Sequence, residues 1–291
     1  MNPRKLLCGL VGAGIQRSLT PALQEAEARA QGLALHYQLI DLDRRGLGPE
    51  ALPAMLDALR TIGFAGFNVT YPCKQAVIPL LDVLSDEART MGAVNTVVLR
   101  DGRLVGHNTD GSGWRSGFER QLPGADLSKV VLLGAGGAGS AIAHALLRMG
   151  VQRLAIVDAE FPRALQLAES LNAVHPGGRA EASAGAAAAL ARASGLVHAT
   201  PTGMDKLPGL PLDEQLLHPG LWVSEIVYFP LETALLRAAR ARGCRVADGG
   251  GMAVGQAVGA FELFTGLRAD AARMEAHFRR LVAPRNEELV A

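Results

Sequence analysis

The chain has 291 residues, and 29 Lys and Arg against 28 Asp and Glu give it a formal net charge of +1. This balance argues against a general nucleic-acid binder, which needs a basic surface to neutralise phosphates. With 49% hydrophobic residues, global disorder is excluded. Three cysteines without a CxxC pair exclude a disulfide framework and a zinc ribbon, so we expect reduced thiols, no metal and a cytoplasmic protein.

Strand-like and helical patterns alternate along nearly the whole chain. Apolar runs predict strands at 6–11, 35–41, 66–70, 96–99, 104–107, 130–133, 154–158, 196–199, 222–226 and 245–246. Helical patterns cover 21–31, 49–62, 139–149, 162–174, 230–242, 253–264 and 270–281, and the alanine-rich stretch 184–193 predicts a surface helix. This alternation indicates an α/β fold of βαβ units with parallel sheets.

The polar segment 121–129 suggests a junction, so we place a switch between two domains near 111–128. The uncharged run 130–147 contains four glycines and changes from a strand pattern to a helical one, so we do not expect a membrane span.

A glycine-rich turn predicts a dinucleotide site. Gly134-x-Gly136-x-x-Gly139 follows an apolar strand and opens a helical pattern, which lets the backbone and the helix N-terminus approach a pyrophosphate. The next strand ends at Asp158, where a carboxylate binds the ribose hydroxyls of the cofactor. An acid there repels a 2′-phosphate and favours NAD, whereas Arg163 could still meet a phosphate, so NADP stays the alternative.

Polar motifs end several strands in the first 110 residues, where α/β proteins place their ligands. Together they supply hydroxyls, a lysine, an amide and a carboxylate, a set that could hold a small polyhydroxylated acid. These residues are Ser18, Thr20, Thr70, Lys74, Asn95 and Asp110.

Further motifs lie in the second half of the chain: Ala199-Thr200-Pro201-x-Gly203-Met204, Tyr228-x-Pro230, and 249–252 followed by Gln256-Ala257 and Phe261. With the motifs above, the chain resembles the shikimate/quinate dehydrogenase family from end to end. The resemblance implies a substrate-binding catalytic domain at 1–110, completed by C-terminal helices at about 253–291, and an NAD-binding Rossmann domain at 111–252.

The same resemblance implies a role for each site residue. Lys74, with Asp110, would exchange the proton of the reacting hydroxyl. The residues implied to bind substrate are Ser18, Thr20, Thr70, Lys74, Asn95, Asp110, Tyr228 and Gln256. Those implied to bind the cofactor are Asp86, Gly134, Ala135, Gly136, Gly137, Ala138, Gly139, Asp158, Arg163, Thr200, Ile226, Gly249 and Met252.

Departures from the usual family pattern bear on the substrate and the cofactor. Thr20, Asp158 and the loop 159–164, which lacks an Asn-Arg-Ser/Thr run, resemble the NAD-dependent quinate/shikimate members. Glu225 replaces an Asp of the family, and His198 replaces an Asn. We therefore expect reversible oxidation of quinate or shikimate to the 3-dehydro ketone with NAD, by a monomer or homodimer. The alternatives are an NADP-linked biosynthetic enzyme, an aminoshikimate-type paralogue and, from another class, a non-catalytic quinate sensor.

A few single residues admit a structural reading. Asp86 opens a predicted helix, so it is as well explained by a helix cap as by a cofactor contact. Cys73, beside Lys74, is better explained by packing than by nucleophilic chemistry. His107 and His198 lie in strand patterns without a partner at metal spacing, so we interpret both as structural.

Overall fold

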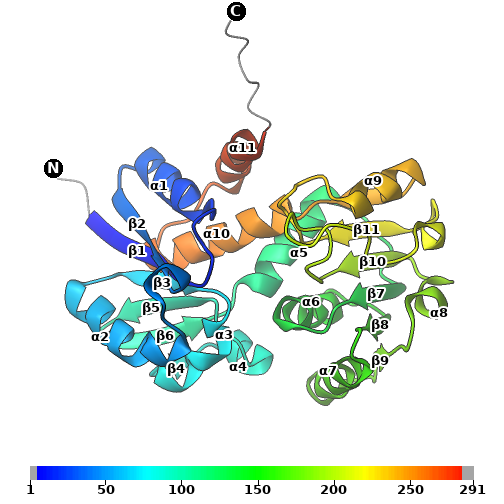
Figure 1. Cartoon of the computed structure of the whole chain (residues 1–291), viewed down its shortest axis with the longest axis horizontal. Coiled ribbons are helices and arrows are strands. Elements are labelled where there is room, and N and C mark those ends of the chain that lie inside the picture. The colour runs from blue at the N-terminus through cyan, green and yellow to red at the C-terminus, as the bar shows by residue number, and fades with distance from the viewer. Residues whose placement is uncertain (1–4, 284–291) are drawn as a thin grey trace, which may run out of the picture.

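The computed structural model describes residues 5–283, and two sheets side by side, each with its own helices, account for most of them (Figure 1). The N-terminal sheet has the strand order β2-β1-β3-β5-β6-β4. Its elements are β1 (Lys5–Gly12), α1 (Thr20–Ala30), β2 (Ala34–Asp41), α2 (Leu52–Ile62), β3 (Gly66–Val69), α3 (Cys73–Ala76), β4 (Val83–Leu84), α4 (Asp86–Met91), β5 (Thr96–Arg100) and β6 (Arg103–His107).

This first sheet is mixed, which corrects the expectation of purely parallel sheets. Strand β5 is antiparallel to both β3 and β6. Strands β5 and β6 are joined by Asp101 and Gly102, with φ of 53° and 76°. Positive φ at both central residues is typical of a two-residue hairpin, which can only connect antiparallel neighbours. The Asp-Gly pair was the signal in the sequence that distinguishes this hairpin from a βαβ unit.

The second sheet is parallel throughout, with the order β12-β11-β10-β7-β8-β9. Its elements are α5 (Asp110–Gln121), β7 (Lys129–Leu133), α6 (Gly137–Arg148), β8 (Arg153–Val157), α7 (Phe161–Val174), β9 (Ala180–Ala182), α8 (Ala186–Leu190), β10 (Gly195–His198), β11 (Trp222–Glu225), α9 (Ala234–Ala241) and β12 (Arg245–Ala247). Helices α10 (Gly250–Thr265) and α11 (Ala271–Val282) follow along the chain. Strand order reverses between β7 and β10, and open α/β sheets bind ligands at such a switch point. The predicted two-domain α/β fold with a Rossmann-type sheet is thereby confirmed.

Helix α5 was not predicted, and three other helices, α2, α8 and α9, are shorter than expected. In α5, Trp114 and Phe118 lie one turn apart and stack at 4.9 Å, and Phe118 meets Trp222 of the second sheet edge-on at 4.8 Å. This tertiary packing stabilises a segment that glycines weaken locally. Helix α8 covers only five residues of the alanine-rich stretch, and its Ala189 and Leu190 are buried rather than on the surface.

Helices α5 and α10 cross side by side between the two sheets, and their backbones touch at glycines (Figure 1). A Cβ added at Gly117 would lie 2.4 Å from the carbonyl carbon of Gly251. A Cβ at Gly255 would lie 2.3 Å from the carbonyl oxygen of Gly113. Since carbon atoms do not approach so closely, we expect any larger residue at these four positions to separate the helices.

The C-terminal helices pack on the N-terminal half of the chain. Phe264 at the end of α10 packs with Tyr37 of β2, and Met274 and Phe278 of α11 pack with Leu23 of α1. Residues 1–4 and 284–291 of the expected first domain lie outside the described residues.

A pair of histidines between α6 and α7 predicts a loss of stability in acid. His144 is buried, and its Nδ1 lies 2.9 Å from Nε2 of His175. Burial, with the neighbouring His175 and Arg148, lowers the pKa of His144 from 6.5 to about 4. The folded protein therefore favours the neutral ring, so its stabilisation is present above about pH 6.5 and is lost as the pH falls toward 4.

We expect the free energy of unfolding to fall by about 1–2 kcal/mol between pH 7 and 5 from this ring alone. Urea denaturation at several pH values measures it. His144→Gln, which does not titrate, should show a shallower fall. Parallel curves for the two proteins would show that His144 does not carry the effect.

Candidate active site

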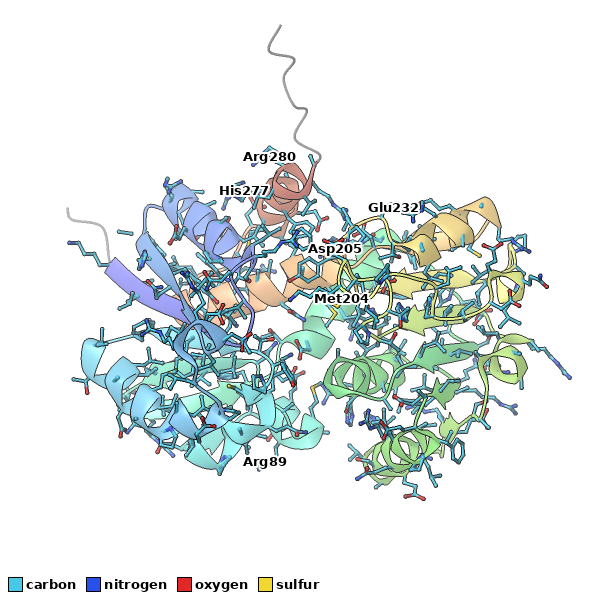
Figure 2. All side chains as sticks on the ribbon, in the orientation of Figure 1. Arg89, Met204, Asp205, Glu232, His277 and Arg280 are labelled. Atoms are coloured by element: carbon cyan, nitrogen blue, oxygen red, sulfur yellow. The ribbon has the colours of Figure 1, made fainter. Side chains whose placement is uncertain are left out.

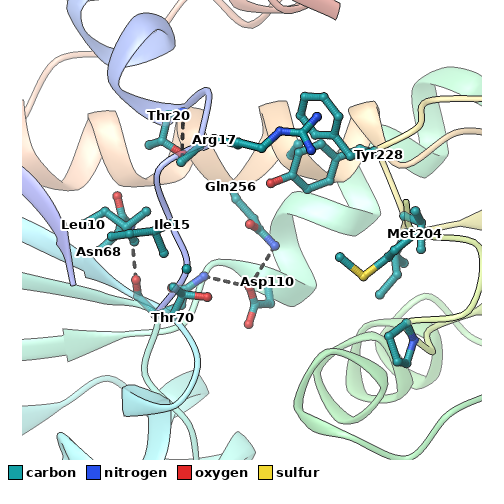
Figure 3. A pocket seen from close by; sticks show the side chains of 18 of the residues that line it. Leu10, Ile15, Arg17, Thr20, Asn68, Thr70, Asp110, Met204, Tyr228 and Gln256 are labelled. Carbon is teal, nitrogen blue, oxygen red and sulfur yellow. Dashed lines mark hydrogen bonds between the residues drawn. The ribbon is translucent and has the colours of Figure 1, made fainter. Parts of the chain in front are cut away.

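A cavity of about 590 Å³ lies between the two sheets, where the carboxyl ends of strands from both halves meet (Figure 3). All eight residues predicted to bind substrate line it, together with two of the predicted cofactor residues. These are Ser18, Thr20, Thr70, Lys74, Asn95, Asp110, Tyr228 and Gln256, with Thr200 and Ile226. Residues far apart in the sequence are thus brought to one cavity.

The centre of the cavity is a buried carboxylate with three side-chain donors. The Nζ atom of Lys74 lies 2.6 Å from Oδ2 of Asp110, whose side chain is 2% exposed. The amides of Asn95 and Gln256 donate to Oδ1 at 2.9 and 2.8 Å. Figure 3 shows Gln256 reaching from α10 toward Asp110 at the beginning of α5. The contacts on both oxygens fix the orientation of the carboxylate, and Asp110 in turn holds the ammonium group at the cavity, where its side chain is 27% exposed.

A second layer of polar groups holds Asn95. Its Oδ1 accepts hydrogen bonds from the N–H of Thr109 at 2.9 Å and from the Thr96 hydroxyl at 2.9 Å. Asn68 donates to Thr96 at 2.9 Å and accepts from the buried Tyr37 hydroxyl at 2.6 Å. Burial raises the pKa of Tyr37 well above its usual value, so the phenol stays protonated and donates. Asn68 also lines the cavity, although no role was predicted for it. Its position two residues before Thr70 in the predicted strand 66–70 was the available signal.

Two hydroxyls lie at the beginning of α1. The Oγ of Ser18 donates to Oγ1 of Thr20 at 3.1 Å. Across the cavity, Figure 3 shows Tyr228 with its ring facing the same space. Burial raises the pKa of Tyr228, so its phenol is a neutral hydrogen-bond donor at ordinary pH. The hydroxyls of Thr20 and Tyr228 can therefore donate to an anionic ligand group, and Ser18 can join them by turning its O–H from Thr20 to the ligand.

The glycine loop after β7 has the features that a dinucleotide phosphate needs. Gly134 has φ of +102°, and a Cβ at Gly139 would lie 2.0 Å from the carbonyl oxygen of Gly134. A Cβ at Gly136 or Gly137 would meet nothing within 4 Å, and no side chain caps α6. Uncapped N–H groups at an open helix N-terminus suit a pyrophosphate, so the residues present fit a nicotinamide dinucleotide.

The predicted ribose-binding acid is next to this loop. Oδ2 of Asp158 accepts the N–H of Ala135 at 2.7 Å, and Oδ1 accepts the N–H of Glu160 at 2.9 Å. Asp158 thus ties the glycine loop to the end of β8. Arg163 is largely exposed and forms an ion pair with Glu160 at 3.0 Å.

Several predicted cofactor residues are not among those lining the cavity, namely Asp86, Gly134 to Gly139, Asp158, Arg163, Gly249 and Met252. Asp86 is the first residue of α4, where the Ser85 hydroxyl provides the N-terminal cap. Gly249 lies against the backbone after β11: a Cβ there would be 2.5 Å from the carbonyl oxygen of Ile226.

A contact that was not predicted bridges the two halves over the cavity. The guanidinium of Arg17 lies 5.2 Å from the centre of the Phe229 ring and 3.5 Å from Oδ2 of Asp205. Figure 2 shows Met204 and Asp205 between the two halves of the molecule. Arg17 and its partners come from distant parts of the chain, so no local pattern could indicate the contact.

The surroundings of Cys73 and His107 explain both residues as structural rather than catalytic. Cys73 is fully buried among the apolar side chains of the first domain. This burial, together with the negative charge of Glu50, raises the pKa of the thiol and disfavours the thiolate. Burial and Arg100 lower the pKa of His107 in β6.

Within residues 5–283, no group of three or more His, Cys, Asp and Glu side chains could hold a metal ion. None of the helices described is both long and apolar enough to cross a membrane.

A Rossmann-type sheet with an open glycine loop, facing a polar cavity that holds a Lys–Asp pair, defines a two-domain dehydrogenase of the nicotinamide dinucleotide class. Comparisons with known proteins specify the family. The model of the shikimate dehydrogenase substrate binding domain matches residues 10–97, and that of the shikimate 5′-dehydrogenase C-terminal domain matches 249–277. The ThiF family model matches 119–161.

Whole-length relatives agree with these models. The chain is 56% identical to a shikimate dehydrogenase (NADP(+)) of Streptomyces avermitilis, over 97% of each chain. It is 48% identical to a quinate/shikimate dehydrogenase (NAD(+)) of Corynebacterium efficiens, over 97% of this chain and all of the other. It superimposes on a quinate dehydrogenase of Corynebacterium glutamicum in complex with NAD, with a TM-score of 0.89 and 45% identity, over 95% and 99% of the two chains. The chain belongs to the shikimate/quinate dehydrogenase family.

Proposed function

We propose that this enzyme oxidises a ring hydroxyl of quinate or shikimate to the 3-dehydro ketone, reversibly, with NAD. The proposal rests on one observation: the Lys74–Asp110 pair lies in a cavity lined by hydroxyls and amides, beside a dinucleotide fold. We assign residues 1–110 with α10 and α11 to the substrate domain and 111–249 to the cofactor domain. The cofactor domain thus ends at residue 249, and not at 252 as predicted from the sequence, because α10 begins at Gly250.

Lys74 performs the proton transfer in this proposal. As a neutral amine, Nζ takes the proton of the reacting hydroxyl; as an ammonium group, it returns that proton when the ketone is reduced. The bound nicotinamide supplies the hydride acceptor. The ammonium also stabilises negative charge that develops on the substrate oxygen, and Asp110 holds it in position.

The other polar residues orient the substrate. The hydroxyls of Ser18, Thr20 and Tyr228 bind its carboxylate, which fixes one end of the ring. The hydroxyl of Thr70, the side-chain amide of Asn95 and the amide oxygen of Gln256 bind ring hydroxyls at the other end. Binding at both ends places one ring carbon next to Lys74 and the cofactor.

NAD is favoured by Asp158, whose carboxylate repels a 2′-phosphate at the end of β8. The second candidate is NADP, because the Streptomyces relative at 56% identity is named for it. Initial rates with quinate and shikimate, each with NAD and with NADP, decide between them. Turnover with an amino-substituted shikimate alone would favour the aminoshikimate-type paralogue, and no turnover with any substrate would favour the quinate-sensing alternative.

Replacing Asp158 by asparagine should change the cofactor preference. The amide keeps the size of the side chain but removes the charge, so we expect the ratio of kcat/KM for NAD over NADP to fall about tenfold. Steady-state kinetics with both cofactors measures the ratio. Glu169→Gln, on the exposed side of α7, removes a charge away from this loop and should leave the ratio unchanged. A wild-type enzyme that already prefers NADP would contradict the role of Asp158.

A further inference from the structure

A histidine and a glutamate form a fully buried pair in the second sheet. His198 of β10 lies opposite Glu225 of β11 in the strand register, and both side chains have no exposed surface. Nδ1 of the histidine lies 2.9 and 3.0 Å from the two carboxylate oxygens. On the other side of the ring, Nε2 lies 2.5 Å from Oγ1 of Thr200, which lines the cavity. The pair therefore connects the protein core to the cavity wall.

Glu225 also organises the chain that follows β11. Its Oε1 accepts the N–H groups of Ile226 and Val227 at 2.8 and 3.0 Å. Its Oε2 accepts the hydroxyl of Thr233 at 3.1 Å, which in turn caps α9. Ile226 and Val227 line the cavity next to Thr200. One carboxylate thus fixes the backbone on which this part of the cavity wall is built.

Burial limits where the protons of this pair can be. A net charge without exposed surface is costly, so we take the pair to be neutral overall. Two forms satisfy this condition: imidazolium with carboxylate, or neutral imidazole with carboxylic acid. The two N–H groups and the hydroxyl on Glu225 favour its carboxylate, and hence the imidazolium of His198. In both forms Nε2 carries a proton, since in the second the acid donates to Nδ1. Only the disfavoured form, a carboxylate beside a neutral ring, leaves Nε2 without a proton.

The proton on Nε2 determines what Thr200 offers to a ligand. With Nε2 protonated, Oγ1 of Thr200 accepts from it, and Oγ1 also accepts the N–H of Thr202 at 3.3 Å. Both lone pairs of the hydroxyl oxygen are then used, so its O–H is left as a donor. We propose that the His198–Glu225 pair positions Thr200 as a hydrogen-bond donor to an oxygen atom at the nicotinamide end of the bound dinucleotide.

This inference rests on the proposed function, because it requires a dinucleotide in the cavity. His198 and Glu225 act in it as positioning residues, and Thr200 makes the contact. It also accounts for two departures from the family pattern together, since the glutamate at 225 and the histidine at 198 are each other's partners.

Nitrogen NMR of the histidine-labelled protein tests the proton position directly. We expect Nε2 of His198 to show the chemical shift of a protonated ring nitrogen. Thr200→Val removes the partner of Nε2 and keeps the size of the side chain. The histidine resonance that moves most in this variant is therefore assigned to His198. An Nε2 shift typical of an unprotonated nitrogen would overturn the proposal.

Binding of NAD+ measured by calorimetry tests the contact itself. Thr200→Val should weaken binding about tenfold, the scale of one hydrogen bond, and Thr200→Ser should restore it. Thr202→Val, two residues away and outside the cavity lining, is the matched control and should bind normally. Normal binding by Thr200→Val, or a loss confined to the acid substrate, would overturn the proposal. A wild-type protein that binds neither NAD+ nor NADP+ would instead contradict the proposed function.

Discussion

Replacing Lys74 by alanine is expected to lower kcat by about 10²–10⁴-fold, the usual contribution of a general acid–base group. The Nζ atom of Lys74 lies in the cavity, 2.6 Å from Oδ2 of Asp110. Alanine leaves no group at this position to exchange the proton. Binding of NAD should change little, because Lys74 lies in the other half of the molecule. Steady-state kinetics together with calorimetry of the dinucleotide separates the two effects.

The matched control for this variant is Lys129→Ala. Lys129 begins β7 and does not line the cavity, so its removal should leave kcat unchanged. Turnover near the wild-type rate in Lys74→Ala would remove Lys74 from the proposed mechanism.

Asp110→Asn should lower kcat by about 10²-fold or more and should also reduce stability. The change removes the charge that positions Lys74, and it turns one carboxylate oxygen into an amide donor. That new donor faces either the ammonium of Lys74 or the amides of Asn95 and Gln256. An unsatisfied contact of this kind in a buried site costs about 1–3 kcal/mol.

Kinetics and urea denaturation measure the two effects on the same variant. Asp57→Asn, on the exposed side of α2, removes the same charge elsewhere and should change neither quantity. A variant that is destabilised but turns over normally would show that Asp110 only supports the fold.

Much of the architecture could be predicted because local patterns and tertiary structure agree there. The apolar runs around Leu132 and Ile156 become central strands of the Rossmann-type sheet, and the glycine loop between them follows from backbone geometry alone. Lys74 and Asp110 were paired in the prediction by the family resemblance, and the structure brings their side chains together.

The features that were missed depend on contacts between distant residues. Helix α5 has three glycines in its first eight residues, which lowers its intrinsic helix propensity, and its packing on α10, α6 and Trp222 stabilises it. The Arg17–Asp205 bridge has no local signal either. His198 and Glu225 were noticed one at a time, but adjacent strands had to be aligned before they could be read as a pair.

The glycine contact between α5 and α10 also determines how this chain can be recombined with a homologue. Gly113 and Gly117 belong to α5, and Gly251 and Gly255 belong to α10. The close approach therefore requires small residues on both helices. A chimaera that takes α5 from one parent and α10 from another keeps the spacing of Asp110 and Gln256 only if both parents have matching small residues there. Exchanging residues 122–249 alone leaves both helices with one parent, and it is therefore the exchange that preserves the catalytic geometry while replacing the cofactor sheet.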